Sequence, residues 1–144
     1  MTFSHDGIHD SLTHLVSPGY FYEELARQIA LSERNKEEFS IIRFLLIANE
    51  PKDRDTEAIN FAQILRTLTR KNECVARMAE DEYVLLIPEN EMKTSIVLSR
   101  IIQAYQISEG TNSKLSSSVV YHHAHESALD LLNRLDKTGL STLQ

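Results

Sequence analysis

The sequence contains a single cysteine, Cys74, few glycines and prolines, and no tryptophan. One cysteine excludes an internal disulfide and a cysteine-rich zinc site. No apolar run approaches the roughly 20 residues that a membrane-spanning helix needs, and the first residues lack the basic start and apolar centre of a signal peptide. We therefore expect a cytoplasmic domain without membrane insertion, in which Cys74 packs as a buried side chain beside an apolar run.

Basic side chains are also scarce. The 144 residues carry a formal net charge of -6, and their Lys and Arg residues form no cluster. A protein that binds nucleic acid by neutralising phosphates needs a clustered basic surface, so this class of protein is excluded. The contents of 42% hydrophobic and 25% charged residues are ordinary for a globular protein. The length predicts one folded domain over residues 1–144.

Hydrophobic periodicity predicts helices and strands along the whole chain. Phe21, Leu25 and Ile29 have the four-residue spacing of an amphipathic helix, and the stretch from Ile41 to Ile47 is almost entirely apolar, as in a strand covered on both faces. Similar patterns predict helices over residues 18–34, 53–70, 90–107 and 125–137, and strands over 39–48, 73–78, 83–88 and 115–122. Without the first helix, the order is strand, helix, strand, strand, helix, strand, which is the ferredoxin-like arrangement.

A compact acidic turn separates two of these strands. Residues 79–83 read Ala-Glu-Asp-Glu-Tyr, and the short apolar runs on either side predict an antiparallel hairpin with the acids at its tip. A tip of this kind is solvated, which is reason enough for an acidic residue at Glu80.

The histidines give weaker signals. Those of residues 122–125 lie with Glu126 where a strand ends and a helix begins, and adjacent spacing does not supply the convergent geometry of a metal site. His5 and His9 are four residues apart, but Gly7 lies between them, so we expect surface residues of a frayed start.

Two stretches match one known family. In "HDSLTHLVSPGYF", from His9 to Phe21, five residues match the opening motif of the GGDEF domain of diguanylate cyclases, while His14 replaces its glycine; the matching residues are Asp10, Leu12, Thr13, Leu15 and Phe21. Residues 58–83, "AINFAQILRTLTRKNECVARMAEDEY", match the family's second helix and signature hairpin without a gap. The acidic turn then occupies the position of Gly-Gly-Asp-Glu-Phe, as Ala79, Glu80, Asp81, Glu82 and Tyr83.

The resemblance implies a fold and a setting. The fold is α/β (α+β), with a ferredoxin-like βαββαβ core of the GGDEF and nucleotide-cyclase palm type and a central antiparallel sheet flanked by helices. The setting is bacterial cyclic di-GMP signalling, and the single domain of residues 1–144 is expected to be a piece of a larger signalling protein. The positions of Asp81 and Glu82 are then explained by inheritance from the signature motif.

The resemblance also implies that catalysis has been lost. Members of the family join two GTP molecules with two metal ions, held by an aspartate at the end of the first strand and by the glutamate of the signature. Here the strand end, residues 45–48, has no carboxylate, and Ala79 and Glu80 replace the two glycines. The guanine-reading segment is shortened to residues 49–53. We expect a degenerate pseudoenzyme with no catalytic residues, metal or cofactor, which acts as a regulatory or scaffolding domain through protein-protein interaction.

Two alternatives remain. Many family members bind cyclic di-GMP through an Arg-x-x-Asp motif before the signature, and Arg70 and Glu73 occupy the matching positions. A nucleotide receptor could therefore bind cyclic di-GMP there, or GTP in the former active-site cleft. A working cyclase is the less favoured alternative, because Glu82 alone cannot hold two metals. The expected partners are other domains or signalling proteins, a second copy of the chain, and cyclic di-GMP if the receptor reading holds.

Overall fold

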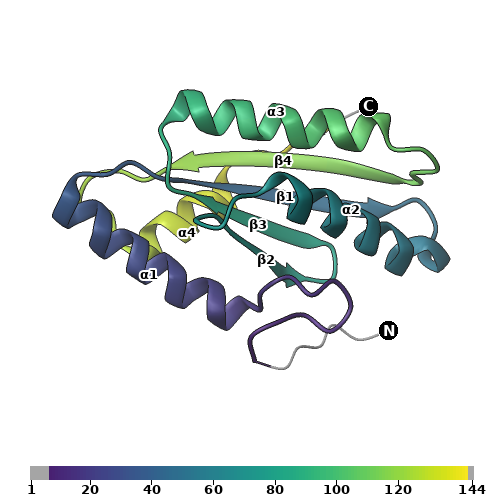
Figure 1. Ribbon diagram of the computed structural model, residues 1–144, viewed down its shortest axis with the longest axis horizontal. Helices are drawn as coiled ribbons and strands as arrows, with labels where there is room; N and C mark the ends of the chain where they lie inside the picture. Colours follow the sequence, from purple (N-terminus) through teal and green to yellow (C-terminus); the bar gives the residue numbers. More distant parts are fainter. Residues whose placement is uncertain (1–6, 143–144) are drawn as a thin grey trace.

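The chain folds into a mixed α/β domain, and the computed structural model describes residues 7–142 of it (Figure 1). His5 lies outside the described residues. The elements follow in the order α1 (Pro18–Asn35), β1 (Ser40–Ala48), the 3₁₀ turn η1 (Pro51–Asp53), α2 (Arg54–Leu68), β2 (Cys74–Ala79), β3 (Glu82–Ile87), α3 (Glu91–Ile107), β4 (Ser113–Tyr121), α4 (Ala128–Lys137) and β5 (Ser141–Thr142).

The strands form one five-stranded sheet in the order β2-β3-β1-β4-β5, in which all neighbouring strands are antiparallel. β1 is the central strand, as its apolar run predicts, and it pairs with β3 on one side and with β4 on the other. This arrangement of a central antiparallel sheet with flanking helices confirms the predicted fold class.

Each face of the sheet has its own hydrophobic core, because successive side chains of a strand point to opposite faces. Ile42, Phe44 and Leu46 of β1 pack on one face with residues of α2 and α3. Ile41 packs on the opposite face with residues of α1 and α4. Figure 1 shows these two helix layers on either side of the sheet.

Three details differ from the sequence predictions. α2 ends at Leu68, so Arg70 lies in the loop that follows rather than in the helix. α4 begins three residues later than predicted, because the Ser127 side chain caps it and His125 adopts a positive φ of 66°. The two-residue strand β5 was not predicted. Among residues 7–142, no helix is both long and apolar enough to cross a membrane.

Candidate functional site

The acidic turn is the tip of the β2–β3 hairpin. A register shift between Arg77 and Ala79 places Ala79 opposite Glu82 and leaves Glu80 and Asp81 at the tip. The carbonyl of Asp81 accepts a hydrogen bond of 2.8 Å from the amide of Leu46, which fixes the tip against the end of β1. No residue of the turn has a positive φ. The turn therefore forms without the backbone conformations for which glycine is normally required.

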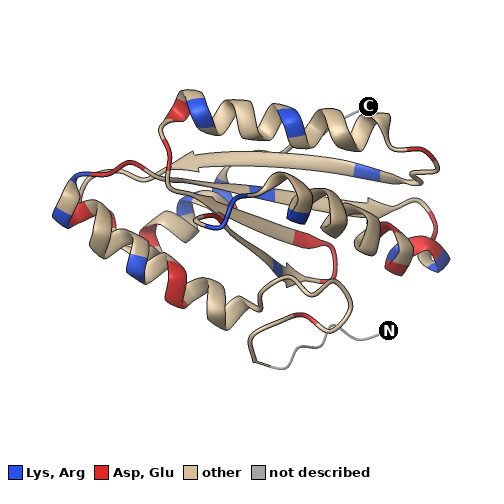
Figure 2. Ribbon diagram, viewed as in Figure 1, with Lys and Arg blue, Asp and Glu red and all other residues tan. Residues whose placement is uncertain are grey.

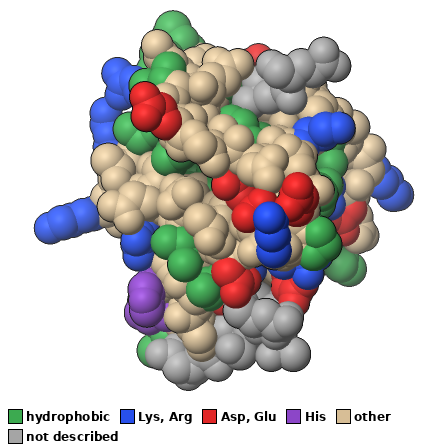
Figure 3. Space-filling model, turned by 90° about the vertical axis from the view of Figure 1, so that its right-hand side faces the viewer, with side chains coloured by type: hydrophobic (Ala, Val, Ile, Leu, Met, Phe, Trp, Pro, Cys, Tyr) green, Lys and Arg blue, Asp and Glu red, His purple; other side chains and the backbone are tan. Residues whose placement is uncertain are grey.

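All three acids of the turn have an arginine partner. Arg43 of β1 donates from Nε to Glu82 at 2.8 Å, in a pair whose side chains are 19% and 26% exposed. Arg54, the first residue of α2, donates to Glu80 at 2.9 Å and lies 3.6 Å from Asp81. Figure 3, which views the molecule from this end, shows acidic and basic side chains side by side. The negative charge of the turn is thus largely compensated within the chain.

A buried ion pair between Arg77 and Asp10 contacts the backbone of the acidic turn. Arg77 donates to both carboxylate oxygens of Asp10, at 3.1 and 3.3 Å, and both side chains are fully buried. Arg77 also donates to the carbonyl of Glu80 at 2.8 Å, while the amide and hydroxyl of Thr13 donate to Asp10. A buried charge needs such a partner and further hydrogen bonds. One network therefore joins the N-terminal motif to the hairpin.

The N-terminal segment reaches this position by pairing with the edge of β2. Val16 forms a parallel bridge with Ala76, and its amide donates to the carbonyl of Val75. His14 adopts a positive φ of 63° in the tight turn that returns the chain toward Val16. The opening motif that this segment resembles has glycine at this position, whereas here a residue with a Cβ takes the left-handed conformation.

Tyr83 anchors the other side of the turn in the core. Its side chain is fully buried, and its ring packs edge-to-face against Phe61 with centroids 5.2 Å apart. Burial raises its pKa to about 12, against the opposing positive charge of Arg77. Within residues 7–142, no contact of its hydroxyl meets hydrogen-bond geometry. Tyr83 is thus a core residue rather than a reactive one.

The residues present do not fit a two-metal site. Glu82 is already paired with Arg43, and the end of β1 offers no carboxylate beside it. In the part of the chain that the structure describes, no group of three or more His, Cys, Asp or Glu side chains is placed to hold a metal ion. Where the histidines of residues 122–125 lie near Glu126, the Glu126 carboxylate accepts from Arg134 at 2.9 Å, and His122 stacks on Phe39 with ring centroids 4.5 Å apart.

Arg70 and Glu73 lie together in the loop between α2 and β2. The Glu73 carboxylate accepts from the backbone amide of Arg70 at 2.8 Å, so it closes the turn locally. Arg70 is exposed, and its guanidinium has no ion-pair partner among the described residues. The structure therefore brings the two residues together and leaves the arginine open to solvent.

Arg43 and Arg54 were not predicted from the sequence as partners of the acidic turn. Arg43 was visible as the one charge in an apolar strand, and a charged residue there needs an opposite charge nearby. Asp10 and Arg77 were both recognised within motifs, but they were not recognised as partners. Arg54 gave no comparable signal, because charged residues are common at the start of an exposed helix.

Solved GGDEF domains share this fold over most of the chain. The GGDEF domain of DgcB from Caulobacter crescentus, solved with cyclic di-GMP, matches with a TM-score of 0.79 and 18% identity, covering 94% of this chain and 87% of that chain. The FimX GGDEF domain from Pseudomonas aeruginosa matches with a TM-score of 0.78 and 15% identity, covering 90% and 89%.

A third neighbour was solved with a protein partner. Diguanylate cyclase SiaD from Pseudomonas aeruginosa, in complex with its activator SiaC, matches with a TM-score of 0.78 and 20% identity, covering 89% of this chain and 55% of that chain. At these identities the likeness establishes the fold. No protein-family model and no curated protein matches the sequence.

Proposed function

We propose that this chain is a catalytically inactive GGDEF-type domain of the bacterial cytoplasm that regulates or scaffolds cyclic di-GMP signalling through protein-protein interaction. The observation that carries the proposal is the pairing of the turn's acids with Arg43 and Arg54. The common occurrence of GGDEF domains among the structural neighbours, some solved with cyclic di-GMP, supports the signalling context.

The ion pairs oppose catalysis in a definable way. Glu82 accepts a partly buried hydrogen bond of 2.8 Å from Arg43. A metal ion bound at Glu82 would have to displace this arginine. No second carboxylate at the end of β1 would compensate for that loss. In addition, Glu80 adds negative charge where the family motif has glycine beside a polyphosphate, and like charges repel strongly in a poorly solvated cleft.

The test is an assay of the purified chain with GTP and Mg²⁺, with cyclic di-GMP measured by chromatography. We expect no product from the chain or from its Glu82→Ala variant, while an active diguanylate cyclase assayed in parallel gives product. Synthesis by the unaltered chain that Glu82→Ala abolishes would overturn the proposal.

A receptor for cyclic di-GMP is the second candidate, and the exposed guanidinium of Arg70 favours it. A planar guanidinium can bind a phosphate through two parallel hydrogen bonds. Titration calorimetry with cyclic di-GMP, and separately with GTP and Mg²⁺, tests this candidate. Saturable cyclic di-GMP binding that is lost in Arg70→Ala and kept in the neighbouring Lys71→Ala supports it, and absence of heat with either nucleotide removes it.

The interaction role implies a partner that belongs either to the same protein or to another one. We propose that residues 1–144 form one domain of a larger signalling protein and that adjoining domains, separate signalling proteins or a second copy bind it. The structural neighbour SiaD, solved with its activator SiaC, gives a precedent for a protein partner.

A further inference from the structure

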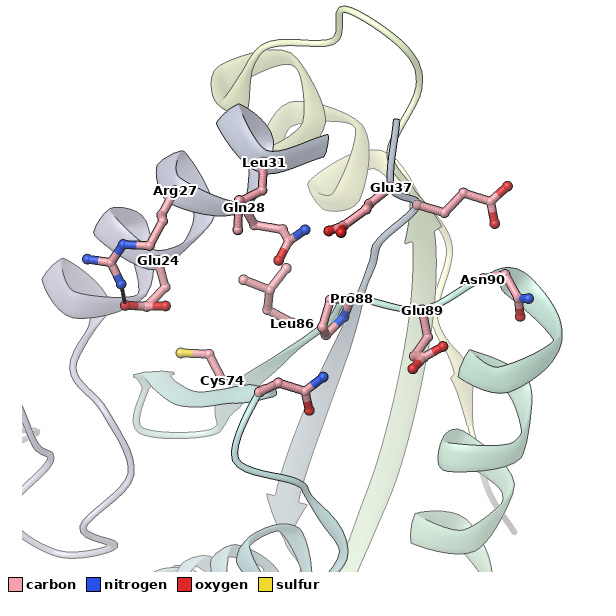
Figure 4. A pocket seen from close by; sticks show the side chains of 12 residues that line it. Glu24, Arg27, Gln28, Leu31, Glu37, Cys74, Leu86, Pro88, Glu89 and Asn90 are labelled. Atoms are coloured by element: carbon pink, nitrogen blue, oxygen red, sulfur yellow. Dashed lines mark hydrogen bonds and ion pairs between the residues drawn. The ribbon is translucent and has the colours of Figure 1, made fainter. Parts of the chain in front are cut away.

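A groove lies on the side of the molecule where α1 approaches the ends of the β2–β3 hairpin that lie away from the acidic turn (Figure 4). It has a volume of about 600 Å³. Its walls are α1, the loop that follows α1, the start of β2 and the segment from the end of β3 to Asn90. None of the turn acids and neither Arg70 nor Glu73 lines it, so the groove is separate from the site described above.

The floor of the groove is apolar. Leu86, which is 4% exposed, lies there opposite its strand neighbour Cys74, with Pro88 beside it and Leu31 of α1 above. Burial, with the nearby charge of Glu24 as a smaller cause, raises the pKa of Cys74 to about 12. The thiol is therefore neutral at physiological pH and acts as apolar surface. The floor can accept an aliphatic side chain.

The rim of the groove is acidic. Four glutamates and one arginine line it, and Arg27 is already paired with Glu24. Glu89 is paired with Lys93 at 3.4 Å.

Glu37 and Glu38 of the α1–β1 loop are exposed and have no ion pair among the described residues. In Figure 4, Glu37 extends over the groove toward Gln28. Two carboxylates without an ion pair among the described residues therefore lie on the rim of a groove with an apolar floor.

We propose that this groove binds a peptide segment of a partner protein in which a lysine or arginine lies next to an aliphatic residue. The aliphatic side chain would cover Leu86 and Cys74, and the basic side chain would pair with Glu37 and Glu38. Charge complementarity at such a rim sets specificity and association rate, while burial of the apolar side chain supplies affinity. The inference rests on the proposed interaction role and names the chemistry of the partner.

The test uses fluorescence anisotropy with the full chain and two labelled peptides of equal length, Gly-Leu-Arg-Leu-Lys-Gly and Gly-Leu-Glu-Leu-Glu-Gly. We expect saturable binding of the basic peptide, at least about tenfold tighter than that of the acidic one, and weaker at high salt. Glu37→Gln/Glu38→Gln should weaken binding of the basic peptide by about fivefold or more. The control Asp55→Asn/Glu109→Gln also removes two charges, in the first turn of α2 and in the loop between α3 and β4. These segments lie at the opposite end of the molecule from the α1–β1 loop (Figure 2), so the control should bind like the unaltered chain.

Cys74 provides a second readout, because it is the only cysteine of the chain. Iodoacetamide reacts with the thiolate, so the alkylation is run at about pH 9 and followed as a slow time course to offset the raised pKa of Cys74. Saturating basic peptide should slow this alkylation further, as measured by mass spectrometry, in the unaltered chain and in the control. Protection locates the peptide on the floor of the groove.

Four results would overturn the inference. The first three are no binding of either peptide, equal binding of both peptides, and binding unaffected by Glu37→Gln/Glu38→Gln. The fourth is competition by spermidine as strong as that by the unlabelled basic peptide, which would mean that the rim recognises positive charge without an aliphatic side chain. Concentration-dependent dimerisation that Glu37→Gln/Glu38→Gln abolishes would assign the groove to a second copy instead. Cyclic di-GMP synthesis by the chain would overturn the proposed function without changing the peptide result, so the two failures are distinguishable.

Discussion

At the scale of single residues, the pair of Asp10 and Arg77 is the most consequential contact beneath the acidic turn. Both side chains are fully buried, and Arg77 also holds the carbonyl of Glu80. Asp10→Ala leaves the arginine buried without its counter-charge, so we expect the free energy of unfolding to fall by about 3–5 kcal/mol. Urea unfolding at pH 7 measures the change.

A matched control comes from an exposed ion pair. Glu24 pairs with Arg27, whose side chain is 64% exposed. Glu24→Gln should change the free energy of unfolding by less than about 1 kcal/mol, because water screens such pairs. Equal losses in the two variants would show that burial is not what makes the pair of Asp10 and Arg77 important.

His14 gives a prediction of the opposite sign. It holds a φ of 63° on the surface, where a side chain with a Cβ is strained and glycine is not. We expect His14→Gly to raise the free energy of unfolding by about 0.5–1 kcal/mol, since relief of strain exceeds the added entropy of the unfolded chain. Thermal unfolding would detect it. Ser11→Gly, at a residue without a positive φ, should bring no gain, and destabilisation by His14→Gly would contradict the prediction.

At the residue scale, only part of the candidate site was predictable from the sequence. The composition of the acidic turn and its place in a hairpin were predictable, because both follow from local sequence. The pairing of the turn's acids with Arg43 and Arg54 was not predictable from local sequence. Arg43 reaches Glu82 only because β1 and β3 pair with Leu45 opposite Glu82, and this register is set by the packing of the whole sheet.

At the scale of elements, α4 is held to the end of β4 by Glu126 and Arg134. Hydrogen bonds from Arg134 lower the pKa of Glu126 to about 2 from its ordinary value of 4.5. A carboxylate with a lowered folded-state pKa stabilises the fold above its unfolded pKa, and this stabilisation is lost as pH falls from about 5 toward 2. With a discount for the partly exposed Arg134, we expect the contribution to be about 1–2 kcal/mol.

The measurement is urea unfolding at several values between pH 7 and pH 3. The unaltered chain should lose this contribution as the pH falls, whereas Glu126→Gln should start lower at pH 7 and show a flatter pH dependence. Parallel curves for the two proteins would mean that Glu126 does not contribute to the acid sensitivity.

Elements with strong hydrophobic periodicity were predictable, and short or capped ones were less so. The nine-residue strand β1 and the helices α1 and α3 agree with their predicted ranges to within about two residues at each end. β5 has two exposed residues and therefore no hydrophobic pattern to detect. The start of α4 depends on the Ser127 side-chain cap and on the backbone of His125, which periodicity does not encode.

At the scale of the whole molecule, the features on which the proposed inactivity rests lie on several elements that meet at one end. The end of β1 has no carboxylate and β1 supplies Arg43, α2 supplies Arg54, and the hairpin has Ala79 and Glu80 where the motif that it resembles has two glycines. These elements are distant in sequence and are brought together by the sheet and by the helix layer above it. Under the proposed function, a substitution that restores the motif residues in one element should leave the other elements still unable to support cyclic di-GMP synthesis.

The double variant Ala79→Gly/Glu80→Gly tests this distribution. It restores both glycines of the signature and removes one partner of Arg54, but Glu82 stays paired with Arg43 and the end of β1 still offers no metal ligand. We expect a folded protein, judged by circular dichroism, that makes no detectable cyclic di-GMP from GTP and Mg²⁺, because in-line phosphoryl transfer by this route needs two bound metals. Synthesis by the double variant that disappears on further Glu82→Ala would show that the turn alone had silenced the domain.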